Sequence, residues 1–180
     1  MIIEHTSYYQ FVQPAMIKII AISLLSLFST PREEARIKAL FIQNFMRNME
    51  WPTEKSDNKY RIAVIGDIYV VEQIRSLTNN RLINNKAVEV VNYTSNVKME
   101  ELNILFISES LSDLYPDYHK VAVPNSVLVV TEAKGLSKAG AAINFVSKGN
   151  KLRFELNTST LAQSNIKASK AITETAQQIN

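Results

Sequence analysis

Three short stretches of this chain are almost wholly apolar, and they constrain its fold more than any other feature. They read RIAVIGD at 61–67, NILFIS at 103–108 and SVLVVT at 126–131. Apolar runs of this length are typical of strands that are buried on both faces, as in parallel sheets. The β-branched stretch AVEVV at 87–91 is also strand-like. We therefore expect a mostly parallel sheet with helices on both sides.

Segments with helical periodicity lie between and beyond these strands. Residues 32–49 predict a first helix with charged residues on one side. The expected apolar face of this helix consists of Ile37, Leu40, Phe41, Phe45 and Met49. A second helix is expected over about 70–77, and a last one from 157 or 158 to about 178. Strands and helices thus alternate, as crossover connections between parallel strands require.

A hairpin is expected after the third apolar stretch. AINFVS at 142–147 and KLRFEL at 151–156 flank Lys148-Gly149-Asn150, a composition typical of a tight turn. This hairpin would add an antiparallel strand at one edge. The expected fold class is α/β, a three-layer α/β/α sandwich with a mostly parallel sheet and an antiparallel edge hairpin.

A short apolar segment lies near, but not at, the start of the sequence. Lys18 precedes ten uncharged residues, Ile19–Phe28, and small residues follow. This order is typical of a secretory signal peptide, and the run is too short to span a bilayer comfortably. A buried first helix is the alternative. We expect translation to begin at Met16. The chain would then divide into an upstream extension at 1–15, a signal peptide at 16–29 and a single exported domain at 30–180.

Residues that could support catalysis or hold a cofactor are sparse in the sequence. His119 is the one histidine after the apolar segment, and the chain has no cysteine. The carboxylates do not cluster, and neither a serine elbow nor a glycine-rich phosphate loop occurs. Gly66-Asp67 ends an apolar strand, where Asp67 is either a helix cap or a ligand contact. We expect no enzyme activity, no cofactor and no metal site.

The charge of the chain is uneven. From Val121 onward, seven lysines and arginines stand against three glutamates. The surface formed by this mildly basic C-terminal third either faces an acidic partner or anionic lipid headgroups, or is simply solvated. No basic run is interleaved with aromatic residues, so a nucleic-acid partner is not expected.

Several motifs, in order and spacing, resemble the YfiR-like family of periplasmic regulatory proteins. They are FIQNFMRNMEWP (41–52), VIGD (64–67), NILFIS (103–108), VLVVTEAKGLSKAGAAINFV (127–146) and KLRFELN (151–157). The resemblance runs from about Ile37 to Ile172. It implies a non-enzymatic exported α/β protein, because the best-known member is a dimeric brake on a membrane-bound diguanylate cyclase, whose periplasmic domain it binds. The disulfide-forming cysteines of that member have no counterpart here.

The apolar side of the first helix, for Phe45 and Trp51, and strand alternation, for the hairpin residues, divide the motif residues into two sets. The residues expected to pack in the core or in a dimer interface are Phe45, Trp51, Phe145 and Phe154. The candidate partner-binding residues, on the opposite face of the hairpin, are Asn144, Arg153 and Glu155. A plain solvated strand face is the alternative for this second set.

The resemblance implies a periplasmic regulator in cyclic-di-GMP signalling. On this basis we expect a homodimer that binds and represses the periplasmic part of an inner-membrane signalling protein, either of the diguanylate cyclase type or a sensor kinase. The alternative is a periplasmic small-molecule-binding module, with its ligand at the carboxyl ends of the strands near Asp67.

Overall fold

The computed structural model describes residues 30–179, except 53–54, 56–57, 93–97 and 150. The predicted upstream extension (1–15) and signal peptide (16–29) therefore lie outside the described residues.

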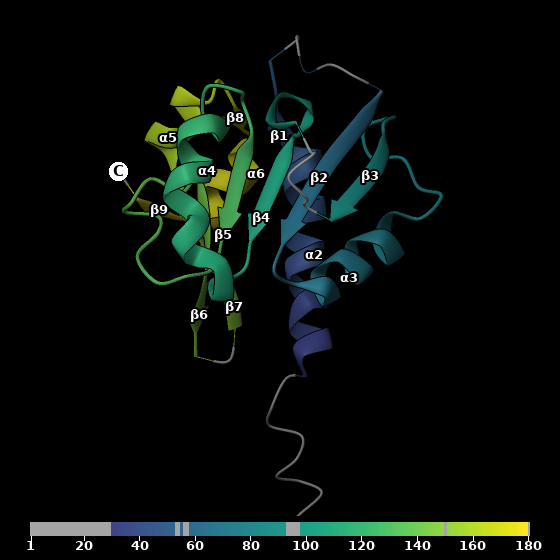
Figure 1. Ribbon diagram of the computed structural model, residues 1–180, viewed down its shortest axis with the longest axis horizontal. Helices are drawn as coiled ribbons and strands as arrows, with labels where there is room; N and C mark the ends of the chain where they lie inside the picture. The colour runs from purple at the N-terminus through teal and green to yellow at the C-terminus, as the bar shows by residue number, and fades with distance from the viewer. Residues whose placement is uncertain (1–29, 53–54, 56–57, 93–97, 150, 180) are drawn as a thin grey trace, which may run out of the picture.

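A seven-stranded sheet forms the centre of the protein, with the strand order β3-β2-β4-β5-β6-β7-β9 (Figure 1). The strands are β2 (Lys59–Ile65), β3 (Ala87–Asn92), β4 (Ile104–Ile107), β5 (Leu128–Thr131), β6 (Ile143–Lys148), β7 (Lys151–Asn157) and β9 (Gln177–Ile179). The five strands from β3 to β6 run parallel, β6 and β7 form the predicted antiparallel hairpin, and β9 lies parallel to β7. The predicted mostly parallel sheet is confirmed.

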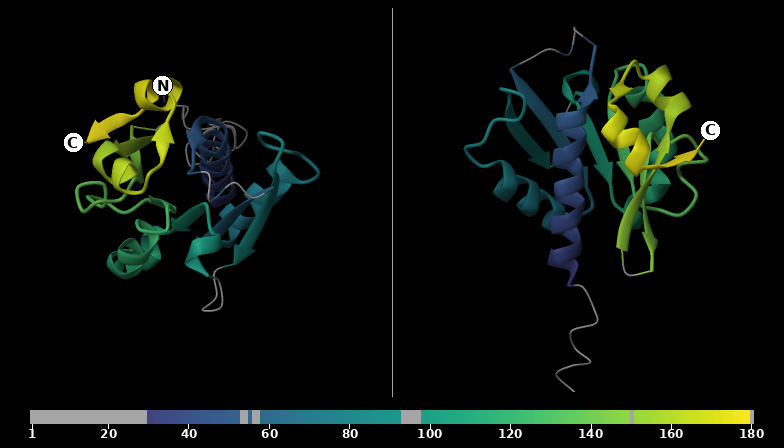
Figure 2. Two further views of the ribbon diagram at one scale, coloured as in Figure 1. Left: turned by 90° about the horizontal axis from the view of Figure 1, so that it is seen from above. Right: turned by 180° about the vertical axis from the view of Figure 1, so that it is seen from behind.

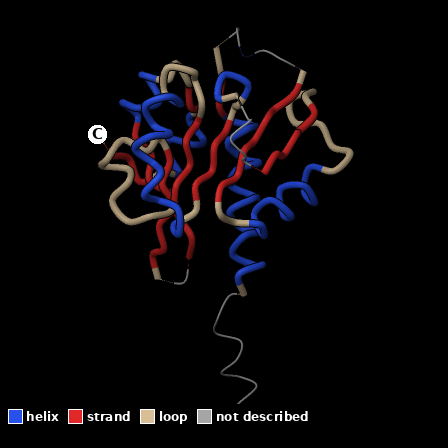
Figure 3. Tube along the Cα trace, in the orientation of Figure 1, coloured by secondary structure: helices blue, strands red, loops and turns tan. Residues whose placement is uncertain are grey.

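Helices cover both faces of this sheet, which confirms the three-layer arrangement (Figure 3). The helices on the first face are α2 (Pro31–Asn48), α3 (Ile68–Thr78), α5 (Thr158–Gln163) and α6 (Lys170–Thr175). The second face is covered by α4 (Tyr115–Ala122) and the short 3-10 helices η2 (Met99–Glu101) and η3 (Glu109–Leu114). The view from behind in Figure 2 has α2 and α6 in front of the sheet, whereas α4 is in front in Figure 1.

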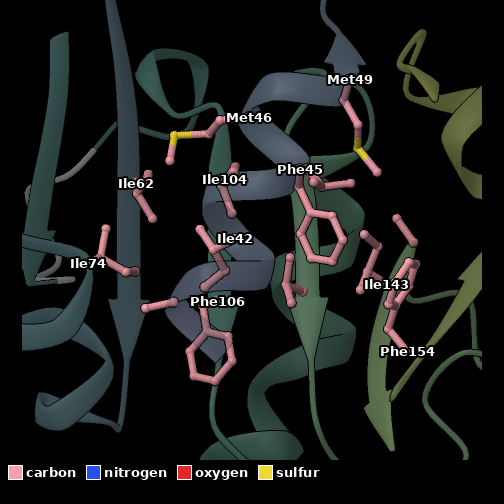
Figure 4. Close-up of a cluster of buried hydrophobic side chains, with 14 of the residues drawn as sticks. Ile42, Phe45, Met46, Met49, Ile62, Ile74, Ile104, Phe106, Ile143 and Phe154 are labelled. Carbon is pink, nitrogen blue, oxygen red and sulfur yellow. The ribbon is translucent and has the colours of Figure 1, made fainter. Parts of the chain in front are cut away.

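Alternating side chains of the strands build a separate core on each face. In β2, Ile62 and Val64 belong to the core under α2 and α3, and Ala63 and Ile65 belong to the core under α4. Figure 4 shows the first of these cores, where the α2 side chains lie against the strands. Such burial on both sides explains why the strands read as continuous apolar runs.

The buried face of the first helix differs from the predicted one. Phe45 and Met49 are buried as expected, but Ile37 and Leu40 are 41% and 43% exposed. The residues of α2 that are buried instead are Ala35, Lys38, Ala39, Ile42 and Met46. The helix packs against α3 as well as against the sheet. Its buried side therefore includes small residues, which allow a second helix to approach closely.

The predicted single C-terminal helix is wrong. The segment consists of α5, a two-residue strand β8 (Lys167–Ala168), α6 and β9. The chain leaves α5 through Asn165, which has a φ of 53° and so breaks the helical path. Strand β8 then pairs with β1 (Met49–Glu50) at the end of α2 in a small separate sheet. Beyond α6, β9 adds a strand outside the predicted hairpin.

Candidate functional site

The carboxyl ends of the parallel strands meet along one edge of the sheet, which is where open α/β folds bind ligands. Strand β6 pairs with β5 only at Val130 and Thr131, and then continues to Lys148 beyond the end of β5. The hairpin thus projects past this edge, beside the first turns of α2 (Figure 1). A hollow is left between the end of β5, the hairpin and α2.

This hollow is a pocket of about 440 Å³ with a strongly charged lining. Its residues are Glu34, Lys38, Glu109, Glu132, Lys134, Gly135, Phe145, Val146, Ser147, Leu152 and Glu155. The apolar wall comes mainly from the hairpin, which also contributes Glu155, whereas the other charges come from α2 and from the segments that follow β4 and β5. The arrangement suits a ligand or peptide that carries charge, since both signs of charge reach the pocket.

Lys38 is the central charged residue of this pocket. It lies on the inward face of α2 and is only 6% exposed. Its ammonium group forms ion pairs with Glu34 one turn earlier, at 2.8 Å, and with Glu132 after β5. Burial alone would lower the pKa of Lys38, but hydrogen bonds and charge attraction from Glu132 and Glu34 outweigh it, so the pKa is raised. Lys38 is therefore held as a cation.

Glu132 links three parts of the site. One of its carboxylate oxygens binds Lys38, and the other accepts a hydrogen bond from the backbone N–H of Glu109, at 3.0 Å. Glu109 follows β4 and Glu132 follows β5, so this contact fastens two strand ends to α2. Sequence reasoning missed both Lys38 and Glu132. The available signal was the spacing of Glu34 and Lys38, which is that of a helical ion pair.

A second polar network lies on the α4 side of the hairpin. The Asn144 side chain accepts a hydrogen bond from the Thr131 hydroxyl at 2.7 Å and donates one to Glu155 at 3.2 Å. Ser137, from the loop after β5, donates to the same Glu155 carboxylate. Asn157 donates to the backbone carbonyl of Ser137 at 2.9 Å, which holds this loop over the strands.

The candidate partner-binding residues therefore do not share one exposed face. Asn144 has 0% exposure, and Glu155 is half-buried and bonded from two sides. The prediction that Asn144 faces outward is wrong, because the loop of residues 132–141 covers that part of the sheet. Arg153 lies closer to the tip of the hairpin, opposite Val146, and is exposed. It remains available for contact with another molecule.

The aromatic motif residues lie on the other face of the sheet. Phe45, Phe145 and Phe154 are each at most 2% exposed, and the Phe45 and Phe154 rings meet edge to face with centroids 5.1 Å apart. Trp51 is half-buried, packs on Tyr60 and donates from Nε1 to the carbonyl of Asn103 at 3.2 Å. In this structure all four side chains are part of the interior packing of one chain.

Asp67 and His119 have local structural contacts. The Asp67 carboxylate accepts a hydrogen bond from the N–H of Val70 at 3.1 Å, so it caps α3, and the cap interpretation is confirmed. His119 lies near the end of α4, where its Nδ1 is 2.9 Å from the Tyr115 hydroxyl. Burial lowers the pKa of His119.

Among the residues that the structure describes, no group of His, Cys, Asp and Glu side chains could hold a metal ion.

The fold and the site define a doubly wound α/β domain with a charged pocket at the carboxyl edge of its sheet. The sequence model of the YfiR/HmsC-like family matches residues 35–177, and the chain therefore belongs to this family. Membership suggests a periplasmic regulator of cyclic-di-GMP signalling, and the family is regulatory rather than catalytic. No curated protein matches the chain. Within the described ranges, no helix is both long and apolar enough to cross a bilayer.

Proposed function

We propose that this protein is an exported repressor that acts as a homodimer on the periplasmic part of an inner-membrane signalling enzyme, either of the diguanylate cyclase type or a sensor kinase. The observation that carries the proposal is the family match, which spans both α2 and the terminal hairpin. Regulation through contact needs a stable surface rather than a catalytic set. The two buried cores, one on each face of the sheet, stabilise the fold that presents such a surface.

The contact proposed for the partner is the projecting part of the hairpin around Arg153. Arg153 is exposed, and so are Lys148 and Lys151 at the turn. No carboxylate of the described residues forms an ion pair with Arg153. Asn144 and Glu155 then act indirectly, because their network with Ser137 fixes the loop beside the hairpin. A positive tip of this kind favours and steers an acidic partner surface.

Charge reversal at Arg153 tests this contact. Arg153→Glu should fold normally and be exported, yet lose repression, while Arg153→Lys should keep it. The measurements are urea unfolding of the purified variants and cyclic-di-GMP levels in cells that carry each variant in place of the parent. A folded, exported Arg153→Glu protein that still represses fully would exclude this part of the hairpin from the mechanism.

Export and dimer formation are tested separately. N-terminal sequencing of the protein from the periplasmic fraction should give a chain that begins near residue 30, after cleavage of residues 16–29. A chain that still begins at Met1 would contradict both the Met16 start and the signal peptide. Sedimentation equilibrium of the mature protein should give twice the monomer mass. A monomer at all concentrations would contradict the homodimer.

A second candidate function is a small-molecule-binding module, which the charged pocket favours. A volume of about 440 Å³ is in the range of small-ligand sites, and Lys38 and Glu132 are already fixed in its wall. A thermal-shift screen with small charged metabolites should then show a ligand-dependent rise in Tm. Lys134→Glu changes an exposed lining residue and should remove that rise without unfolding the protein. No shift with any metabolite would favour the protein-contact function alone.

A further inference from the structure

Strand β3 is one edge of the central sheet (Figure 1). Half of the backbone N–H and C=O groups of an edge strand point away from the sheet. The N–H of Ala87 donates to the carbonyl of Asn58 at 3.1 Å, so Ala87 faces β2. Because the backbone direction alternates in a strand, Glu89 and Val91 also face β2. Val88 and Val90 therefore direct their N–H and C=O groups outward. No strand among the described residues pairs with this side.

The position of Arg75 confirms which groups point outward. Its guanidinium reaches from α3 and donates to the carbonyl of Val90 at 3.0 Å. The outward carbonyl is thus satisfied by an exposed side chain rather than by a neighbouring strand. The outward N–H groups of Val88 and Val90 have no hydrogen-bond acceptor among the described residues. An open edge of this kind can accept an added strand.

A groove lies along this edge, between β3 and the end of α3. It has a volume of about 490 Å³, and its lining residues are Arg75, Ser76, Thr78, Asn79, Asn80, Val88 and Val90. Val88 and Val90 offer apolar surface at alternate positions, and the end of α3 offers hydroxyl and amide groups. A helix beside an open strand edge is the arrangement in which extended peptides bind by strand addition.

The charges around the groove select the kind of peptide. Arg75 is the one charged residue among those that line it. The single carboxylate of β3, that of Glu89, lies on the opposite face and is bound by Lys59 at 3.2 Å and Arg61 at 3.3 Å. Hydrogen bonds and charge attraction from Lys59 and Arg61 lower the pKa of Glu89. Nothing acidic in the lining would repel a carboxylate near Arg75.

We propose that the β3–α3 groove binds an extended, acidic segment of another protein by β-strand addition. The segment would accept hydrogen bonds from the outward N–H groups of Val88 and Val90. One of its backbone N–H groups would replace Arg75 at the Val90 carbonyl, which frees the guanidinium for a carboxylate of the segment. This surface is separate from Arg153, so the proposal stands whether or not the hairpin contact is correct.

The test begins with a phage-displayed library of random nine-residue peptides, selected on the folded protein. We expect enriched peptides that combine Asp or Glu with β-branched residues. Synthetic copies should slow amide exchange at Val88 and Val90. Val90→Pro removes one outward N–H without breaking the pairing with β2, and it should weaken binding at least tenfold. Val90→Thr keeps the N–H and is the matched control, with unchanged binding expected.

Arg75→Glu gives an independent variant in an exposed position and should also weaken binding at least tenfold. If Val90→Pro does not fold, the binding measured for Arg75→Glu tests the proposal instead. The proposal is overturned if no acidic peptide is enriched, or if enriched peptides bind the folded Val90→Pro or Arg75→Glu protein as well as the parent. It is also overturned if sedimentation shows that a second copy of this chain occupies the edge, through a self-association that Arg75→Glu abolishes.

Discussion

The ammonium group of Lys38, on the inner side of α2, is paired with the carboxylate of Glu132 at the end of β5. Both side chains are largely shielded, with exposures of 8% and 13%. The pair joins the first helix of the chain to a strand end almost a hundred residues later. Both residues line the charged pocket, so the pair joins the α2 wall of the pocket to the end of β5.

Removal of one member of this pair should be costly. Lys38→Met leaves the Glu132 carboxylate shielded without its cation, and we expect a loss of about 3 kcal/mol in the free energy of unfolding. The double variant Lys38→Met with Glu132→Gln should recover a large part of that loss. Urea titrations of the parent, both single variants and the double variant measure the coupling. Additive losses would mean that the two charges do not stabilise each other.

The aromatic cluster gives a second prediction, which also tests the corrected face of α2. Phe45 is 0% exposed and contacts Phe154, so Phe45→Ala should lower the free energy of unfolding by about 3–5 kcal/mol. Leu40→Ala, in the same helix, should cost less than about 1 kcal/mol because Leu40 is exposed. Equal losses for the two variants in urea titration would contradict the orientation of this helix.

The strands of the sheet could be predicted from the sequence because a strand that is buried on both faces has few alternatives to an apolar run. The same reasoning failed for part of α2, where Ile37 and Leu40 have the correct helical spacing but Ala35 and Ala39 take the inner face instead. Hydrophobicity alone does not record that small residues allow closer helix packing. The prediction of one helix after Asn157 failed because strand β8 forms only through its pairing with β1, which is far away in sequence.

The site was predictable only in part. Alternation placed Asn144 and Glu155 on one face of the hairpin, and their hydrogen bond shows that they share it. Alternation cannot say what covers a face, and the covering loop is fixed by Ser137, a residue without any distinctive local pattern. Lys38 could not be predicted as a site residue for a related reason. A lysine is expected in solvent unless its carboxylates are known, and Glu132 comes close to it only in the folded chain.

Gly66 gives a prediction about the end of β2. Its φ of 86° lies in the left-handed region, and a Cβ atom there would clash with the Ser108 hydroxyl and stand 2.9 Å from a Leu111 methyl. Gly135 has nearly the same φ, 87°, but no atom within 4 Å of such a Cβ. Gly135→Ala should therefore cost about 1 kcal/mol for the backbone alone, and Gly66→Ala at least about 2 kcal/mol more. Similar losses in urea unfolding would show that the contacts with Ser108 and Leu111 relax freely.

The last prediction concerns the pH dependence of stability through Lys55. Burial lowers the pKa of Lys55 to about 8, against an opposing attraction from Glu100, and its amino group donates to the carbonyl of Leu102. The pKa is thus below that of the unfolded chain, 10.5. Below pH 8 the Lys55 amino group is protonated in both the folded and the unfolded chain. The folded protein then bears the full free-energy cost of keeping that charge partly shielded from water. Between pH 8 and 10.5 the unfolded chain binds more protons, so this residue's contribution to stability must rise with pH.

Two variants isolate that contribution from the other groups that titrate in this range. Lys55→Met has no charge at any pH, and Lys55→Arg keeps its charge throughout, so neither variant has the titration. The free energy of unfolding should be measured by urea titration from pH 7 to 10 for all three proteins. The parent should gain about 2 kcal/mol relative to each variant over this range, which corresponds to most of the shift in pKa. If the three curves stay parallel, the amino group of Lys55 is solvated in the folded protein and does not lie against the Leu102 carbonyl.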